Sequence, residues 1–402
     1  MRSSTPKVSY VHFNTAGSWL FAKYAFALKS AGAEVEIASV GPPREQLVAG
    51  CYDQLVPTTV FGHSPSITAA FKPMKELQRI LGRLARSAAL RKLKCHLTNA
   101  RPSHLIAGDP FALAMCAPLS QRLPARLIYI PFEFYPKHIG ASRRQTTRFG
   151  ACERRHIDQA AAVVFLGDSI LEYYKQEYPN IATRGQVIYS SWPLCRSQIE
   201  LRLRKAVNAG NDKKIILYQG IIELDRGLLN VVRALKKLPA DTLFVTVGYG
   251  SATGALEQCA LELGIRERLL LLPPVPQAEL MSYTKDADIG IIPLLGVKSH
   301  PYACPGKLFE YIGAELPLVV SDMPNLKLLV EKYGLGEVYP ADSVEHLTEA
   351  VSRLLRSDSY RKQCAGNARK GQLEDLCWEK QSARLCDIVF KATPALCAPS
   401  SA

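Results

Sequence analysis

Gly220 and Arg226 follow a strand-like run in the second half of this 402-residue sequence. The run is Lys214–Tyr218, and the glycine after the arginine, Gly227, precedes a stretch with apolar residues at helical spacing. The N-terminus of a helix favours anions, and a guanidinium can bind a phosphate through two parallel hydrogen bonds. This spacing therefore predicts that Arg226 lies beside a helix N-terminus at the carboxyl end of a strand, where it could bind a phosphate.

A second cation, Lys307, follows the pair Pro305-Gly306, which is typical of the start of a helix. Glu310 stands three positions further on and would share a helix face with the lysine. A lysine in a first helical turn opposes the helix dipole, a conflict that a phosphate-binding site would tolerate, and Glu310 could accept hydrogen bonds from sugar hydroxyls. In isolation, the same spacing is also typical of an ion pair on a solvated helix face, and both interpretations stay open.

Two further patterns carry weaker signals. Gly248-Tyr249-Gly250 ends another strand-like run, where the glycines indicate either a close backbone approach to a phosphate or a tight turn. Asp286-Ala287-Asp288 has the spacing of many metal sites, but it stands at the start of the strand-like run Ile289–Pro293. Ligands of parallel sheets bind at the opposite ends of the strands. We therefore interpret these two aspartates as structural and expect no metal.

The first half holds fewer candidates. Glu133 lies between two aromatic residues just past the apolar run Arg126–Ile130, where a buried charge would be costly. The sequence predicts either a site-facing role or a structural ion pair for it. Asp109 before Pro110 fits a helix N-cap followed by proline at the first helical position. His12 and Trp19, which flank the first turn, are more typical of packing residues than of ligands.

Short β-branched runs alternate with amphipathic helical stretches through both halves of the chain. This rhythm predicts doubly wound parallel sheets, and two such sets in a chain of this length predict two domains. The pattern lapses between Pro193 and Asp212, which we take as the boundary. The expected strands are Val8–Phe13, Glu34–Ser39, His104–Ala107, Arg126–Ile130, Ala162–Leu166, Gln186–Tyr189, Lys214–Tyr218, Thr242–Val247, Leu269–Leu272, Asp288–Pro293 and Leu318–Ser321.

Composition narrows the classes of protein. Apolar residues make up 48% and charged residues 21%, which is typical of a globular chain. The eleven cysteines occur singly, without a Cys-x-x-Cys pair, so neither a disulfide framework nor a zinc site is predicted and a reducing cytoplasm is indicated. We expect no cleaved signal peptide before Val8–Phe13, and no apolar stretch approaches the ~20 residues that cross a bilayer.

The net charge of +14 indicates an anionic partner. Nine Lys or Arg residues and one acid lie within residues 72–101, with Lys75, Arg79, Arg83 and Arg86 at helical spacing. This segment predicts either a solvated helix face or an interfacial helix that contacts anionic lipid. Nucleic acid fits worse, because the segment lacks interleaved aromatic residues and a recognition motif.

Taken in order, the motifs of the second half resemble the donor-binding half of GT-B glycosyltransferases, and more closely the retaining glycosyltransferase family four. The match in order and spacing covers about residues 213–356. The motifs are Tyr218-Gln219-Gly220, Arg226-Gly227-Leu228, Gly248-Tyr249-Gly250, Pro305-Gly306-Lys307-Leu308-Phe309-Glu310-Tyr311 and Leu316-Pro317-Leu318-Val319-Val320. The first half is similar more loosely, through Gly17, Asp109-Pro110, Ser169 and the segment 131–136, and Cys377-Trp378-Glu379 resembles the family's final helix.

Three positions depart from the family pattern. Tyr302 stands where the family often has the first of two glutamates eight positions apart, of which Glu310 matches the second. Ile221 stands at the place of one member of a basic pair, and Arg226 matches the other. Phe132 replaces the histidine expected before Glu133.

The resemblance implies an α/β, GT-B architecture in which two Rossmann-like, doubly wound parallel-sheet domains face each other across a cleft. It implies an acceptor-side domain over 1–195, a nucleotide-sugar-binding domain over 196–375, and a helix over 376–392 that crosses back to the first domain. The implied reaction moves a sugar from a nucleoside diphosphate sugar to a hydroxyl of a glycan or a lipid-linked acceptor, with retention and without metal or other cofactor. The implied location is the cytoplasm or the cytoplasmic face of a membrane.

The resemblance also assigns roles to residues. Arg226, Lys307 and Glu133 would be catalytic, and Glu310 would bind the ribose of the donor. The donor-binding residues that it implies are Gly17, Gly220, Arg226, Gly248, Gly250, Cys304, Gly306, Lys307 and Glu310. Two other interpretations stay open: a catalytically degenerate GT-B scaffold or binding protein in glycan assembly, and a nucleotide-sugar epimerase or hydrolase.

Overall fold

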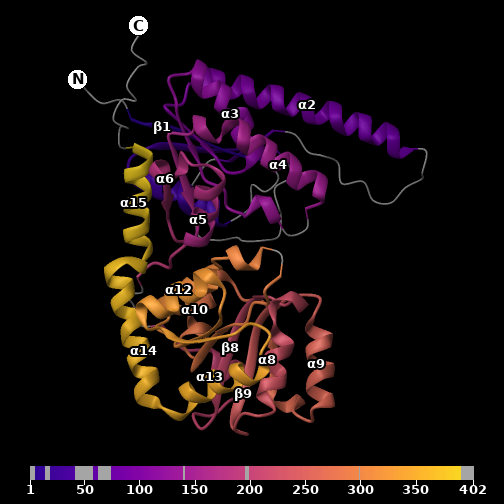
Figure 1. Cartoon of the computed structure of the whole chain (residues 1–402), viewed down its shortest axis with the longest axis vertical. Helices are drawn as coiled ribbons and strands as arrows, with labels where there is room; N and C mark the ends of the chain where they lie inside the picture. Colours follow the sequence, from indigo (N-terminus) through magenta and orange to yellow (C-terminus); the bar gives the residue numbers. More distant parts are fainter. Residues whose placement is uncertain are drawn as a thin grey trace. The chain divides into compact units, whose positions relative to one another are not determined.

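The computed structural model of the chain describes residues 5–13, 19–40, 58–61, 74–138, 141–194, 199–297 and 299–390. It separates into two compact units (Figure 1). The first contains residues 1–166, 171–188 and 382–402, and the second contains residues 167–170 and 189–381. Each unit is therefore built from more than one stretch of sequence.

The first unit contains a seven-stranded parallel sheet in the order β3-β2-β1-β4-β5-β6-β7. The order reverses between β1 and β4, where Val8 is in register with His104. The strands are β1 (Lys7–Phe13), β2 (Glu34–Val40), β3 (Thr58–Val60), β4 (His104–Ala107), β5 (Arg126–Tyr129), β6 (Ala162–Phe165) and β7 (Gly185–Val187).

The second unit contains a six-stranded parallel sheet in the order β10-β9-β8-β11-β12-β13. Here the order reverses between β8 and β11, where Ile289 is in register with Ile216. The strands are β8 (Lys214–Ile221), β9 (Thr242–Tyr249), β10 (Leu269–Leu272), β11 (Ile289–Ile292), β12 (Leu318–Ser321) and β13 (Gly336–Tyr339).

Helices connect most of the consecutive parallel strands, since parallel neighbours need a crossover connection. Those before residue 200 are α1 (Trp19–Ser30), α2 (Met74–Ala100), α3 (Pro110–Arg122), α4 (Arg143–His156), α5 (Asp168–Glu177) and α6 (Ile181–Arg184). Those that follow are α7 (Leu203–Ala206), α8 (Leu228–Leu235), α9 (Thr253–Glu262), α10 (Gln277–Thr284), α11 (Gly306–Gly313), α12 (Pro324–Tyr333), α13 (Val344–Arg356), α14 (Asp358–Gly371) and α15 (Trp378–Phe390).

The eleven predicted strands and the doubly wound fold class are confirmed, with ends that differ by at most three residues. Two edge strands, β3 and β13, were not predicted. Each is short, and β13 carries Gly336 and Glu337 among its four residues, so it lacks the β-branched run that marks a central strand. Along the described ranges, no helix combines the length and the apolar character needed to cross a membrane.

The core of the second unit follows from its sequence pattern. The strands of the sheet are nearly continuous apolar runs, as expected where helices cover both faces. The predicted helical spacing of Leu228, Val232, Leu235 and Leu238 is confirmed, because all four side chains are buried in one cluster with Phe244 of β9. This packing fixes the position of β8 and of the loop that follows it.

Asp109 caps α3, as the sequence predicted. Its side chain accepts hydrogen bonds from the backbone N–H groups of Phe111 (2.8 Å) and Ala112 (3.0 Å). The same carboxylate accepts a third bond from Phe13 at the end of β1 and lies 3.5 Å from Nε2 of the buried His12. Burial raises the pKa of Asp109, and His12 opposes this shift. These contacts join β1 to α3 in the core of the first unit.

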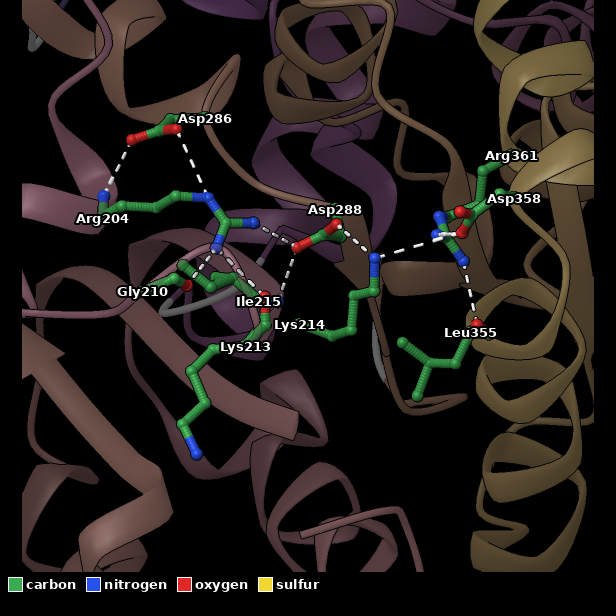
Figure 2. Close-up of polar contacts among 10 residues, drawn as sticks. All are labelled: Arg204, Gly210, Lys213, Lys214, Ile215, Asp286, Asp288, Leu355, Asp358 and Arg361. Carbon is green, nitrogen blue, oxygen red and sulfur yellow. Dashed lines mark hydrogen bonds and ion pairs between the residues drawn. The ribbon is translucent and has the colours of Figure 1, made fainter. Parts of the chain in front are cut away.

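The Asp-Ala-Asp motif lies at the amino end of β11, as predicted, and its carboxylates contact Arg204 of α7 (Figure 2). Asp288 Oδ2 accepts hydrogen bonds from Arg204 Nη2 at 2.7 Å and from the backbone N–H of Ile215 at 2.8 Å. Asp286 Oδ2 accepts from the backbone N–H of Arg204 at 2.8 Å. Lys214 Nζ lies 3.7 Å from Asp288 Oδ1. The motif therefore fixes α7 and the start of β8 to the start of β11.

We expect Asp288→Ala to lower the free energy of unfolding of the second unit by about 2–4 kcal/mol, because it removes the closer of the two carboxylates beside the Arg204 guanidinium and the acceptor of the Ile215 N–H. Calorimetry of the purified protein measures this effect. Asp212→Ala is the matched control, because Asp212 is exposed and its ion pair with Lys213 is 3.9 Å long, so a change within about 0.5 kcal/mol is expected. Equal effects of the two substitutions would contradict the structural role of the motif.

Candidate functional site

The predicted phosphate-binding residues gather where the strand order of the second sheet reverses. The loop after β8 carries Arg226, and the loop after β11 leads through residues 293–305 into α11. In doubly wound sheets, such a reversal separates two neighbouring crossovers and leaves room for a ligand at the carboxyl ends of the strands. The site below is described within this one unit.

Lys307 lies in the first turn of α11, as the Pro305-Gly306 pair predicted. Its Nζ is 3.8 Å from the centroid of the Tyr218 ring on β8, a cation–π contact. Burial and, to a smaller extent, the nearby Arg226 lower the pKa of Lys307 to about 7, while Glu310 opposes the shift. Lys307 therefore interacts electrostatically with both Arg226 and Glu310, which brings the three predicted residues to one region of the second unit.

The absence of a side chain at Gly220 allows Lys307 to approach the end of β8. The glycine has φ +113°, a conformation that residues with a side chain rarely adopt. A Cβ at this position would lie 3.3 Å from Lys307 Nζ. The glycine at the end of β8 thus serves both the backbone turn and the approach of the lysine.

Glu310 is oriented by β8 rather than by Lys307 alone. Its Oε2 accepts a hydrogen bond from Gln219 Nε2, and Gln219 Oε1 accepts one from Thr284 Oγ1 at 2.9 Å. The adjacent Tyr311 hydroxyl accepts from the Gln219 N–H at 3.1 Å and donates to the Leu217 carbonyl oxygen at 3.1 Å. These contacts attach the first two turns of α11 to the strand that precedes Arg226.

Arg226 ends a 3₁₀ turn, Leu224–Arg226, directly before α8. Its Nε lies 3.6 Å from Oδ1 of Asp225, and its side chain is about one quarter exposed. Gly227 follows with φ +72°, and a Cβ there would collide with the Pro293 carbonyl oxygen of the neighbouring loop. Glycine at this position lets the β8 and β11 loops pack directly against each other.

The other glycines of the predicted set have a structural explanation. Gly248 and Gly250 stand at the end of β9, where a Cβ on either would collide with the backbone of β8 and its loop, at Gly220 and Ile222. Gly306 is the first residue of α11, and helical first turns carry amide N–H groups without intrahelical partners. Cys304 lies just before α11, and burial raises the pKa of its thiol, so it stays protonated at neutral pH.

A buried asparagine that the sequence did not single out fixes the loop before α11. Asn325 Nδ2 donates to the carbonyl oxygens of Tyr302 and Ala303, each at 3.1 Å, and to Ser169 Oγ at 2.7 Å. Its Oδ1 accepts from the Ser169 N–H at 2.9 Å. In the sequence it is only the second residue of the helix that begins at Pro324, so no local pattern could have identified it.

Two predicted residues belong to the first unit. Glu133 is exposed and helps to raise the pKa of the buried Tyr135. Gly17 lies outside the described residues. Of the basic segment 72–101, residues 74–100 form α2, in which Arg91, Lys92 and Lys94 are exposed and Leu93 is buried.

The arrangement in the second unit is suited to a phosphorylated ligand. Two cations and the N-terminus of α11 supply positive charge, while the carboxylate of Glu310 supplies a hydrogen-bond acceptor one turn away. Within the described ranges, no group of three or more His, Cys, Asp or Glu side chains has the geometry to bind a metal ion.

The sequence of the second unit is similar to that of known glycosyltransferases. Residues 200–371 match the family model of glycosyl transferases group 1. An uncharacterized glycosyltransferase of Methanocaldococcus jannaschii is 26% identical over 183 residues, which is 45% of each chain. D-inositol 3-phosphate glycosyltransferase of Xylanimonas cellulosilytica is 26% identical over 200 residues, 48% of this chain and 45% of the relative. The matches therefore span less than half the length of these curated relatives.

Solved structures match nearly the whole chain. WaaG, a glycosyltransferase involved in lipopolysaccharide biosynthesis, superposes with a TM-score of 0.66 and 16% identity, covering 96% of this chain and all of WaaG. Anabaena HepE in complex with UDP gives a TM-score of 0.71 and 14% identity, covering 95% and 98% of the two chains. The chain has the GT-B fold, and its second domain resembles the group 1 glycosyl transferases, as the motifs predicted.

The charge of Lys307 should cost stability in a defined pH window. The ordinary lysine pKa is 10.5 and the folded value is about 7, so between these values the unfolded state binds more protons and stability rises with pH. Lys307→Met keeps the length and removes the charge. We expect it to raise the melting temperature by a few degrees at pH 7 and below, and to lose this gain as the pH approaches 10.

Lys380→Met is the control, because Lys380 is exposed on α15 of the same unit and its replacement should shift the melting temperature little at any pH. A melting temperature of Lys307→Met that is unchanged, or lowered equally at pH 6 and pH 10, would show that the lysine is not buried beside like charge.

Proposed function

We propose that this protein is a glycosyltransferase that moves a sugar from a nucleoside diphosphate sugar to a hydroxyl of a glycan or a lipid-linked acceptor. The observation that carries the proposal is the convergence of Arg226, Lys307 and Glu310 at the start of α11, beside the end of β8. The family match over the same residues supports it. UDP complexes of a protein with the same fold support the nucleotide part of the proposal.

The chemistry that these residues offer is stabilisation of a leaving group. When the bond between the sugar and the diphosphate breaks, negative charge grows on the phosphate oxygen that departs. Arg226, Lys307 and the first amide groups of α11 are fixed in place before the reaction, so they stabilise this charge without reorganisation. Glu310, oriented by Gln219, would accept hydrogen bonds from the ribose hydroxyls.

Retention of configuration and independence of metal belong to the same proposal. In a retaining reaction of this kind, the departing phosphate oxygen can itself take the proton of the acceptor hydroxyl. The protein then supplies cations rather than a general base. Two cations and a helix N-terminus are sufficient to balance much of the charge of a diphosphate without a divalent ion.

The Lys307 side chain would also respond to the donor. Its pKa of about 7 without ligand means that a neutral fraction exists at neutral pH. A diphosphate beside the amine favours the charged form, so donor binding would take up a proton. The buried lysine is thus suited to a ligand that brings negative charge. Without such a ligand, its positive charge lowers the stability of the folded protein.

Arg226→Ala should lower turnover by roughly 10²-fold, since it removes charge stabilisation that is strongest in the transition state.

Glu310→Ala should instead raise the dissociation constant of the free nucleoside diphosphate by roughly tenfold, because a hydrogen bond to a charged acceptor is lost. Steady-state kinetics and calorimetric titration measure the two effects, with the exposed Glu331→Ala as a control. Nucleotide release by the wild type that does not depend on added acceptor would contradict a transferase and favour a hydrolase.

We further propose that the protein works in the cytoplasm, at the membrane surface, where α2 contacts anionic lipid during assembly of a polysaccharide or another glycan. The exposed Arg91, Lys92 and Lys94 lie on this helix. Each basic residue near an anionic surface contributes about 1 kcal/mol, so three of them contribute more than a 100-fold difference in partitioning.

Replacing Arg91, Lys92 and Lys94 by glutamine should therefore abolish most co-sedimentation with vesicles that contain one third anionic lipid at low salt. The matched control replaces Arg143, Arg144 and Arg148, which are exposed on α4 of the same unit, and should retain binding. Equal loss in both triple variants would indicate attraction by net charge alone and would remove the role of α2.

A further inference from the structure

His300 is a buried residue of the second unit that neither the sequence motifs nor the proposed function uses. It begins the 3₁₀ turn His300–Tyr302 in the loop between β11 and α11, and it is 1% exposed. Its Nδ1 lies 3.0 Å from the carbonyl oxygen of Leu295, and its Nε2 lies 3.6 Å from Asp225 Oδ2. The histidine therefore reaches from the β11 loop to the loop after β8.

The two neighbours of the ring determine its protonation. A carbonyl oxygen can only accept a hydrogen bond, so Nδ1 carries a proton. Nε2 faces a carboxylate oxygen, which is favourable only when this nitrogen also carries a proton. The nearby carboxylate therefore favours a proton on both ring nitrogens, although burial opposes the charged form. In the protonated form, His300 would place a positive charge beside Asp225.

The carboxylate of Asp225 lies between His300 and Arg226 and contacts both. While its Oδ2 faces His300, its Oδ1 lies 3.6 Å from Arg226 Nε. An ion pair through Nε restrains the guanidinium and leaves the edge formed by Nη1 and Nη2 for a different anion. That edge has the fork geometry that binds two phosphate oxygens at once.

The backbone around this series of contacts is restrained as well. The Leu295 N–H donates to the Asp225 carbonyl oxygen at 3.4 Å. Leu295 therefore contacts Asp225 through its N–H and His300 through its carbonyl oxygen. Gly227 contacts the Pro293 carbonyl on the other side of Arg226. The β8 and β11 loops are joined on both sides of the arginine, and His300 and Asp225 lie between them.

We propose that His300 and Asp225 are positioning residues that present the Nη1–Nη2 edge of Arg226 to the diphosphate of the donor. This inference rests on the proposed function, in which Arg226 binds that diphosphate. His300 also balances the charge of Asp225. Without the imidazolium, the carboxylate would compete with the diphosphate for the arginine.

The test compares binding of nucleoside diphosphates and monophosphates to the full-length protein by calorimetric titration. UDP, GDP and ADP are screened first, and the tightest binder and its monophosphate serve as probes. We expect His300→Phe, which keeps the ring volume, and Asp225→Asn, which keeps the shape, each to raise the dissociation constant of the diphosphate about 5- to 20-fold. The monophosphate should respond less, because it offers the arginine fewer oxygens.

A double-mutant cycle separates positioning from a general effect on the fold. In an Arg226→Ala background, His300→Phe and Asp225→Asn should add little further loss, because both act through the arginine. Ser299→Ala, in the same loop, is the control and should bind like the wild type. If His300→Phe does not fold, the partly exposed Asp225 still permits the cycle.

Additive losses in the cycle, or equal losses for monophosphate and diphosphate, would overturn the inference while the proposed function stands. A wild-type protein that binds none of the three nucleoside diphosphates would overturn the proposed function and this inference with it. The two failures are distinguishable, since the first appears only in the variants and the second already in the wild type.

Discussion

The site depends on the burial of Lys307, whose positive charge lies close to that of Arg226. Arg226 ends the loop after β8 and Lys307 lies in the first turn of α11, at the same strand reversal. Burial, together with the neighbouring guanidinium, brings the pKa of the lysine to about 7. Like charges that approach in a region of low dielectric destabilise the protein unless an anion joins them. The buried charge is thus unfavourable in the protein alone, and the diphosphate of the proposed donor would relieve this cost.

The rest of the second unit restrains these charges. Gln219 of β8 orients Glu310, Asn325 fixes the loop before α11, and Asp225 restrains the arginine. All of these contacts join segments that are distant in sequence but meet where β8 and β11 lie side by side. A parallel sheet makes this meeting unavoidable, because its strands deliver their following loops to one edge. The precision of the site therefore comes from the sheet, and its charge comes from the loops.

Sequence patterns predict the parts of this arrangement that depend on local spacing, but not the contacts between distant residues. The strand runs, the α11 start and the structural role of Asp286 and Asp288 were predictable, because each depends on local spacing and strand polarity. His300, Gln219 and Asn325 were not, since their roles arise from partners up to 156 positions away and no local pattern marks them. The contributions of Gly248 and Gly250 were ambiguous in the sequence, and the contacts of the missing Cβ atoms provide a backbone explanation for both.

The division of the chain has a practical consequence for protein engineering. Residues 167–170 and the first turn of α15 are counted with the second unit, although the chain on the other side of each belongs to the first. A recombinant fragment that begins near residue 189 would therefore lack Ser169, the partner of Asn325. At its other end, such a fragment would have to stop inside α15 or include the part of α15 that belongs to the first unit. Chimaeras between chains of this fold would retain the second unit best if the crossovers were placed after residue 188 and after residue 381, with residues 167–170 left intact.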